Sequence, residues 1–436
     1  MDIQDFIQDH LGDDVAELVL HRDRYPGVDI ALAADCITAR RKLRDKVPEW
    51  YANPRLIFPV PLSAEQCSST TTAKYKAKLA SESLESRGEA LADLTGGLGV
   101  DSWKFASIAK RVLYNDMSPK LAEAARQNFA ELGLDNVQIS NEEITKDNIG
   151  QILDEFQPDI VFMDPARRSS SGSKVFKLAD CCPNILELQD IILNHGCTLM
   201  LKLSPMADLT VLQTQLHHLR EIHILGSNGE CKELLTVQEK SKGSSSKTQE
   251  NDLDPLQKPG VYVKNGQKCT SHPKNFQEPK IVVAEGSKTF SFYPDEEQNA
   301  REPRGATTGP IVTPTYLFQP GAALMKSGAF KLISSRYPGL EALGKDAHYY
   351  VGQEIIPDLS TFGKWLRIKE IHPFDNKSLK DIAKRYPKAA LTARALPLNT
   401  EALRKKMGIT EGGNVHLFAL GTSQGRLMLV CTDPCS

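Results

Sequence analysis

The chain has 436 residues, of which 40% are hydrophobic and 25% are charged, and its formal net charge is −2 at pH 7. This composition is typical of folded globular domains and excludes a disordered chain or one that is basic throughout. The length predicts several domains, and no stretch approaches the roughly 18 consecutive apolar residues of a membrane-spanning helix.

The cysteines and the N-terminal residues indicate a cellular compartment. The nine cysteines are scattered without a C-x-x-C pair, which favours free thiols in a reducing environment over disulfides or a metal site. The N-terminal residues are acidic and amphipathic and lack the pattern of a signal peptide. We therefore expect a cytoplasmic protein with no metal and no membrane contact.

Two patterns divide the first 240 residues. Within residues 1–85 the apolar positions recur three and four apart, which predicts a helical region. Residues 86–240 instead alternate short apolar runs with amphipathic stretches, which predicts a parallel sheet covered by helices on both faces. The predicted strands are "EALADLT", "RVLYNDM", "VQIS", "DIVFMDP", "TLMLKLS", "IHILGS" and "ELLTVQ". Only "NGECK" separates the last two, so they should form a hairpin.

The remaining residues predict a linker and two small α+β domains. Residues 241–280 begin with a Ser-, Lys- and Gln-rich segment without an apolar repeat, which is typical of a flexible linker or long excursion. In residues 281–360 a hairpin, "KIVVAEG" and "TFSFYP", precedes a turn and a helix within "YLFQPGAALMKSGAFKLISSRY". In residues 361–436 we expect strand, helix, strand, helix and two further strands.

The stretch "LADLTGGLGVDS" lies between the first predicted strand and the first helix of the sheet region. Glycines let the main chain turn sharply and approach a ligand, and a helix N-terminus presents free N–H groups. Asp116 ends the second predicted strand, 23 positions after Asp93, where an acid can accept hydrogen bonds from both hydroxyls of a ribose. The ligand should therefore contain a nucleoside.

Three kinds of nucleotide ligand bind glycine loops of this type. A phosphate-binding P-loop requires Lys and then Ser or Thr after its last glycine, and Val100 and Asp101 occupy those positions. A dinucleotide fingerprint would run from Gly97 to Ser102, but Asp101 would then bring negative charge toward a pyrophosphate. S-adenosylmethionine fits better because its ammonium and sulfonium groups are attracted by nearby acids.

The stretch resembles motif I of class I S-adenosylmethionine-dependent methyltransferases, with Asp93, Gly97 and Gly99 in register. Thr95 stands where the family has its first glycine, and Gly96 is additional. The resemblance implies a Rossmann-like seven-stranded methyltransferase sheet, with S-adenosyl-L-methionine as cofactor. Asp116 matches the ribose-binding acid of the family. The implied cofactor-binding residues are Asp93, Thr95, Gly96, Gly97, Gly99, Asp101, Asp116, Met117, Asn141 and Glu142.

The fourth predicted strand ends at Asp164-Pro165. The proline stops the strand and places the carboxylate at the carboxyl end of the sheet, where open α/β sheets bind ligands. Amino-methyltransferases that the chain resembles continue there with a second proline and an aromatic residue, whereas this chain has Ala166 and Arg167. We assign a catalytic role to Asp164, Pro165 and Arg167, with Asp164 orienting an acceptor amine.

Two further cations extend this predicted acceptor site. Arg168 follows in the same loop, and Lys202 ends the fifth predicted strand at the same edge of the sheet. We assign both to substrate binding, since arginine suits an anionic backbone. The alternatives are solvated loop charges for the two arginines, a strand-end cap for Asp164 and a lysine that merely extends to solvent at position 202.

The segment "EQCSSTTTAKYKAKLA" resembles the one before motif I in a bacterial group of methyltransferases with a ferredoxin-like domain and a C-terminal THUMP-like domain. The resemblance implies that residues 281–360 are ferredoxin-like and that residues 361–436 are THUMP-like. Ser69 or Thr70 can cap the helix that follows, in which Lys74, Tyr75 and Lys78 lie about one turn apart. Gln66, Ser68 and Ser69 either cover the cofactor or serve helix capping.

A basic segment supports an RNA partner. Residues 361–410 contain 12 Lys and Arg against 4 Asp and Glu, a net charge of +8. THUMP domains bind RNA, so we assign Arg404 and Lys405 to substrate binding, with electrostatics supplying much of the affinity. The alternative is a solvated basic face.

Together these observations favour a methyltransferase that modifies a base nitrogen in RNA, tRNA or rRNA. One rival is a noncatalytic RNA-binding protein that retains the cofactor fold, which the altered corner after Asp164 keeps open. The other is a dinucleotide-dependent oxidoreductase, for which no residue suited to hydride chemistry stands out.

Overall fold

The computed structural model describes residues 2–85, 89–167, 177–240, 262–264, 267–269, 278–301, 315–344, 346–422 and 425–434. The chain forms two compact units, Met1–Glu221 with Leu235–Pro279 and Ile222–Leu234 with Lys280–Ser436. Each unit contains hydrophobic clusters of its own.

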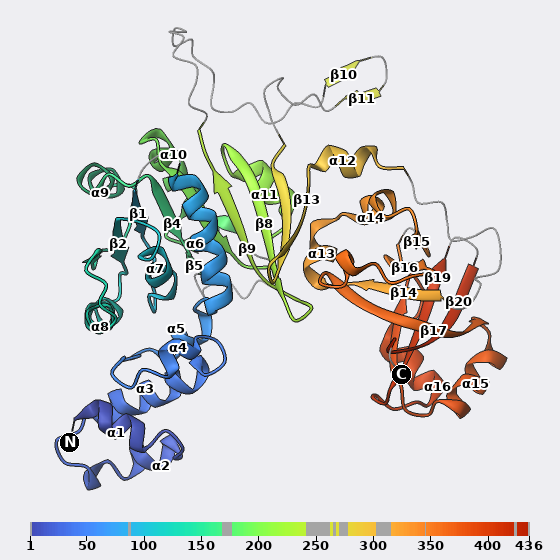
Figure 1. Ribbon diagram of the computed structural model, residues 1–436, viewed down its shortest axis with the longest axis horizontal. Helices are drawn as coiled ribbons and strands as arrows, with labels where there is room; N and C mark the ends of the chain where they lie inside the picture. Colours follow the sequence, from blue (N-terminus) through green and yellow to red (C-terminus); the bar gives the residue numbers. More distant parts are fainter. Residues whose placement is uncertain are drawn as a thin grey trace. The chain divides into compact units, whose positions relative to one another are not determined.

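Helices fill the N-terminal region, as predicted (Figure 1). Three of them begin at a residue whose side chain accepts a main-chain N–H: Asp14 from Ala16, Asp29 from Leu32, and Ser69 from Thr72. Such caps satisfy donors that have no partner inside the helix. The helices are α1 (Ile3–Asp9), α2 (Val15–Leu20), α3 (Ile30–Leu43), α4 (Pro48–Tyr51), α5 (Pro61–Gln66) and α6 (Thr70–Leu84), with a 3-10 turn at Arg22–Arg24.

A nine-stranded sheet follows, with strand order β13-β12-β8-β9-β7-β4-β1-β2-β3. Strands β1, β2, β3, β4 and β7 pair in parallel. The strands are β1 (Ala90–Asp93), β2 (Arg111–Asn115), β3 (Val137–Ser140), β4 (Ile160–Met163), β7 (Thr198–Leu203), β8 (Leu219–Ser227), β9 (Glu230–Gln238), β12 (Lys280–Glu285) and β13 (Lys288–Phe292). Seven of them form the expected Rossmann-like sheet, and β12 and β13 extend it.

Residue types explain these strands. Every residue of β1, β4 and β7 is buried, as a parallel strand covered on both faces requires. Between β8 and β9 the chain turns through Asn228 and Gly229, which both have positive φ, 54° and 77°. This is the backbone that a tight two-residue hairpin turn demands, so the predicted hairpin is confirmed.

Helices pack on this sheet. One hydrophobic cluster joins α6 and α7 to β1, β4, β7 and β9, while α10 contacts β7 and α9. The helices are α7 (Val100–Phe105), α8 (Pro119–Glu131), α9 (Ile149–Phe156), α10 (Ile185–Asn194) and α11 (Leu209–Gln215). The short strands β5 (Ala166–Arg167) and β6 (Cys181–Cys182) pair with each other, and a 3-10 turn, Leu178–Asp180, precedes β6.

The second unit contains a seven-stranded sheet in the order β15-β16-β14-β17-β20-β19-β18. Its strands are β14 (Thr315–Pro320), β15 (Glu341–Ala342), β16 (Tyr350–Gly352), β17 (Gly363–Pro373), β18 (Ala390–Arg394), β19 (Val415–Thr422) and β20 (Gly425–Thr432). Its helices are α12 (Pro294–Asn299), α13 (Ala322–Ser327), α14 (Phe330–Arg336), α15 (Asn376–Arg385) and α16 (Thr400–Met407), with a 3-10 turn at Pro357–Leu359. The element order expected after residue 361 is confirmed.

One local expectation was wrong. The segment expected to form a turn and a helix contains β14 and two helices, because β14 pairs with both β16 and β17. Gly328, with φ 79°, ends α13 before α14 begins. Such pairing with distant strands overrides what a short segment indicates by itself.

Two predicted features concern the rest of the chain. Most of the linker expected at 241–280 lies outside the described residues. In the part that is described, β10 (Tyr262–Lys264) and β11 (Gln267–Cys269) pair as an antiparallel ladder. The cysteines found as free thiols are Cys36, Cys67, Cys181, Cys182, Cys197, Cys231 and Cys431. In the described ranges, every helix is too short or too polar to cross a bilayer.

Candidate functional site

Asp93 ends β1 and lies almost fully inside the protein, with 1% of its surface exposed. Ser102 on α7 donates its hydroxyl to one carboxylate oxygen of Asp93 at 2.5 Å, and the Thr95 N–H reaches the other at 3.3 Å. Burial raises the pKa of Asp93 to about 8, against the lowering effect of the Ser102 hydrogen bond. A cationic group bound beside Asp93 would oppose this effect and favour the ionised form.

Glycine is required at three positions of the loop after β1, for two different reasons. Gly97 and Gly99 have φ of 55° and 94°, a left-handed backbone that favours glycine. At Gly96 an added Cβ would lie 2.2 Å from Cε2 of Tyr114, whose hydroxyl donates to the Gly97 carbonyl at 2.6 Å. The additional glycine of this loop is therefore explained by packing against Tyr114.

Asp116 holds the same loop from the end of β2. Its carboxylate accepts the N–H of Gly97 at 2.9 Å and that of Ser118 at 2.8 Å. Met117 is 58% exposed, and Asn141 donates its side-chain amide to the Asp116 carbonyl at 2.6 Å. The loops after β1, β2 and β3 thus meet at the carboxyl edge of the sheet.

Asn115, which no sequence pattern indicated, joins two of these loops. Its buried side-chain N–H2 donates to the carbonyls of Leu94 at 3.1 Å and Glu142 at 3.0 Å, and its amide oxygen accepts the Glu142 N–H at 2.9 Å. The contacts of Glu142 with Asn115 are made by its main chain, and its side chain is exposed.

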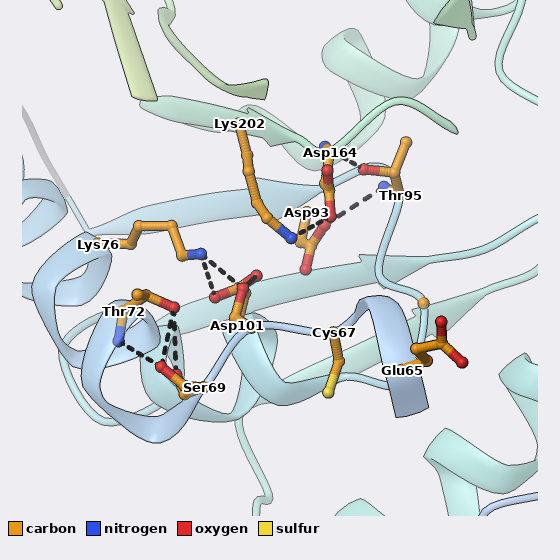
Figure 2. A network of polar contacts seen from close by, with 12 residues as sticks. Glu65, Cys67, Ser69, Thr72, Lys76, Asp93, Thr95, Asp101, Asp164 and Lys202 are labelled. Atoms are coloured by element: carbon orange, nitrogen blue, oxygen red, sulfur yellow. Dashed lines mark hydrogen bonds and ion pairs between the residues drawn. The ribbon is translucent and has the colours of Figure 1, made fainter. Parts of the chain in front are cut away.

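The Asp164 corner lies beside the glycine loop, as Figure 2 shows. Its N–H donates to the Thr95 hydroxyl at 2.5 Å, and Lys202 donates to its Oδ2 at 2.6 Å. Lys202 is therefore paired with Asp164 rather than extended to solvent. Pro165 is half-buried.

After Pro165 the main chain of Arg167 pairs with Cys181. The Arg167 side chain and the whole of Arg168 lie outside the described residues. Their predicted roles at the acceptor corner therefore stay predictions.

A buried lysine that we did not predict completes the cluster (Figure 2). Lys76 of α6 is fully buried, lies 3.1 Å from Oδ1 of Asp101, and donates to the Ser68 hydroxyl at 2.6 Å. Ser68 in turn donates to Oδ2 of Asp101 at 2.7 Å. Asp101, predicted as a cofactor residue, is thus held by Lys76 and Ser68.

Helix periodicity could have identified Lys76. The buried residues of α6 include Ala73, Lys76, Ala77 and Ala80, a spacing that places all of them on one face. The residues singled out from the sequence, Lys74 and Lys78, are exposed.

Gln66, Ser68 and Ser69, for which cofactor covering or helix capping was predicted, differ in their contacts before α6. Ser69 caps the helix, accepting the Thr72 N–H at 3.1 Å, while the buried Ser68 contacts Asp101. Gln66 is exposed at the end of α5. Helix capping therefore accounts for Ser69, and Ser68 instead connects the N-terminal helices to the glycine loop.

Two of the four basic residues assigned to substrate binding, Arg404 and Lys405, lie in the second unit, on α16. Arg404 pairs with Glu411, and Lys405 is exposed, as is its neighbour Lys406. The lysines are accordingly better placed than Arg404 to contact a polyanion.

At the sheet edge the described cluster contains three carboxylates, Asp93, Asp101 and Asp164, and two ammonium groups, Lys76 and Lys202. The raised pKa of Asp93 favours its protonated form, in which the two remaining carboxylates balance the two ammonium groups. A cationic group bound beside Asp93 would favour its ionised form, and the glycine loop admits close main-chain contact with such a ligand.

Two family profiles match the second unit, "THUMP domain-like" at residues 363–433 and "ferredoxin-like domain" at residues 316–359. A solved structure from Porphyromonas gingivalis W83, described provisionally as a methyltransferase, has a TM-score of 0.74 and 26% identity, covering 99% of this chain and 97% of that one. No curated protein matches the sequence significantly.

Weaker likenesses accompany this one. An rRNA methylase from Streptococcus thermophilus covers 38% of this chain and 94% of its own, with 17% identity and a TM-score of 0.28. TrmN from Thermus thermophilus covers 41% and 52%, with 17% identity and a TM-score of 0.29. TM-scores this low carry no conclusion about this chain.

The "THUMP domain-like" match shows that the chain carries a THUMP-like C-terminal domain, as expected. The chain also shares its architecture over nearly its whole length with the Porphyromonas gingivalis protein.

Proposed function

We propose that this protein is an S-adenosylmethionine-dependent methyltransferase that modifies a base nitrogen in RNA, either tRNA or rRNA. The observation that carries the proposal is the joining of two loops at one sheet edge. The glycine loop after β1, suited to the cofactor, is hydrogen-bonded through Thr95 to the Asp164 corner, suited to an acceptor.

The cofactor fits the residues present. Asp93 and Asp101 would face the methionine end, where S-adenosylmethionine carries an ammonium and a sulfonium. Asp116 would hold the ribose, because each of its oxygens accepts one main-chain N–H and keeps lone-pair capacity for a hydroxyl. Met117, Asn141 and Glu142 would border the adenine.

The acceptor side requires positioning more than acid–base chemistry. When bound, S-adenosylmethionine would supply an activated methyl group, whose bond to sulfur would break as the bond to the acceptor nitrogen forms, with S-adenosylhomocysteine as the leaving group. Because Lys202 occupies Oδ2 of Asp164, Oδ1 would accept an N–H of the acceptor base and aim its lone pair. Alignment of this kind supplies a large part of the rate in two-substrate reactions.

The second unit supports RNA as the substrate class. Its THUMP domain-like match spans most of the segment 361–410 with its net charge of +8. Contacts of such a segment with phosphates would give a strongly salt-dependent affinity. RNA and reduced cysteines both fit the cytoplasm.

A transfer assay tests the proposal. The purified protein is incubated with tritiated S-adenosylmethionine and total RNA from a strain that lacks the gene. We expect label in the RNA, and no label with Asp164→Ala, although calorimetry with S-adenosylhomocysteine should give an affinity within a few fold of wild type. Binding of NADH without binding of S-adenosylhomocysteine would contradict the proposal.

One specific observation favours a second candidate. Ala166 and Arg167 replace the proline and aromatic residue expected after Asp164-Pro165, so the chain could be a noncatalytic RNA-binding protein that retains the cofactor. It would then bind S-adenosylhomocysteine and RNA but leave every RNA fraction unlabelled.

A further inference from the structure

Thr95 occupies the position where motif I has its first glycine. Its backbone does not require glycine, since positive φ in this loop is confined to Gly97 and Gly99. The side chain is therefore compatible with the loop conformation, and its contacts give it a task that glycine could not perform.

The hydroxyl of Thr95 joins two segments that lie 69 positions apart in the chain. It accepts the main-chain N–H of Asp164 at 2.5 Å, while the Thr95 N–H donates to Asp93 at 3.3 Å. Thr95 thus contacts the buried acid of the cofactor loop and the main chain of the acceptor corner at once (Figure 2).

This hydrogen bond lies where the sheet stops holding the two segments together. The register of β1 with β4 ends with Asp93 opposite Phe162, and the last main-chain bond runs from the Leu94 N–H to the Phe162 carbonyl at 3.0 Å. Beyond this bond, the half-buried Asp164 N–H donates to the Thr95 hydroxyl instead of to a main-chain carbonyl of β1.

We propose that Thr95 is a positioning residue for methyl transfer, which fixes the Asp164 corner relative to the cofactor loop. The inference rests on the proposed function, since the two loops would hold the methyl donor and the acceptor nitrogen. Methyl transfer requires the acceptor nitrogen, the methyl carbon and the sulfur to lie in line. A misplacement of about 1 Å can lower the rate by about 100-fold.

Variants of Thr95 separate this role from cofactor binding. Thr95→Val keeps the shape of the side chain but removes the acceptor oxygen, and Thr95→Ser retains the oxygen. Thr214→Val is the matched control, because the exposed Thr214 hydroxyl on α11 donates only within its own helix, to the Val211 carbonyl at 2.9 Å. Each protein is assayed for single-turnover transfer to RNA and for S-adenosylhomocysteine affinity by calorimetry.

We expect Thr95→Val to lower the single-turnover rate by about 100-fold while its cofactor affinity stays within about threefold, a ratio that corresponds to less than about 1 kcal/mol. Thr95→Ser and Thr214→Val should stay near the wild-type rate. Residue-resolved hydrogen exchange should show faster exchange of the Asp164 amide in Thr95→Val than in Thr95→Ser.

Three results would overturn the inference. They are a wild-type rate for Thr95→Val, a parallel loss of cofactor affinity, and a serine variant as slow as the valine variant. If the wild-type protein labels no RNA, the proposed function fails. The role of Thr95 is then decided by the Asp164 amide, and unchanged exchange in Thr95→Val refutes it.

Discussion

Replacing Lys76 by methionine should destabilise the first unit by about 3–5 kcal/mol, because it leaves the Asp101 carboxylate buried without its cation. Lys76 is 0% exposed and Asp101 10% exposed, and their charged atoms lie 3.1 Å apart. At this distance, and with an effective dielectric constant of about 20, their attraction is about 5 kcal/mol.

The cost of removing Lys76 is not the net contribution of the pair. Taking both charges out of water opposes much of their attraction, so an intact buried pair adds little compared with neutral residues of similar shape. Loss of one partner leaves the desolvation of the other uncompensated. The double variant Lys76→Met with Asp101→Asn should therefore be more stable than the sum of the single effects predicts.

Tryptophan fluorescence in urea can follow the first unit separately. Trp50 and Trp103 belong to it and Trp365 to the second unit, so a Trp365→Phe background reports on the first unit alone. Arg126→Met is the control, because Arg126 and its partner Glu123 are each 57% exposed, and it should leave the midpoint almost unchanged. A cost below about 1 kcal/mol for Lys76→Met, or strictly additive effects with Asp101→Asn, would refute the reasoning.

Three further outcomes follow from individual residues. The pKa of Asp93, raised by burial to about 8 from 3.8, makes its contribution to stability complete below about pH 4 and lost as the pH rises through about 8. Asp93→Asn should therefore flatten the decline of unfolding free energy across that window, and parallel wild-type and variant curves in urea titrations would contradict this. Asp116→Ala should weaken S-adenosylhomocysteine binding by about 1–3 kcal/mol in calorimetry, and an unchanged affinity would remove Asp116 from the ribose site. Neutralising Lys405 and Lys406 should lower RNA affinity and reduce its salt slope by about 2, whereas an identical slope would indicate a merely solvated face.

Most strands of the sheet were predicted from the sequence because each has the apolar pattern that a buried strand requires. β1, β4 and β7 are buried on both faces and read as unbroken apolar runs. The hairpin of β12 and β13 was also predicted from its apolar pattern. However, no residue pattern shows which sheet edge a hairpin joins. The two strands that enlarge the nine-stranded sheet were therefore missed as part of it.

The same distinction holds at the site. Asp93, Asp116 and Asp164 were found from the sequence because each directly follows or ends a strand at the ligand-binding edge. The partners that hold the cluster in place come from tertiary packing. Lys76 reaches Asp101 from a different helix, and the Thr95 hydroxyl reaches a main-chain donor in a distant loop. The sequence does not show which distant residues form such pairs, although the helical spacing of α6 does place Lys76 on its buried face.

The nucleosides of cellular RNA test the central claim most directly. Purified tRNA and rRNA from a strain lacking the gene and from its parent are digested to nucleosides and compared by mass spectrometry. Our account predicts that one nitrogen-methylated nucleoside disappears in the deletion strain and returns with the wild-type gene, but not with Asp164→Ala. Identical methylated-nucleoside profiles in all of these strains would contradict it.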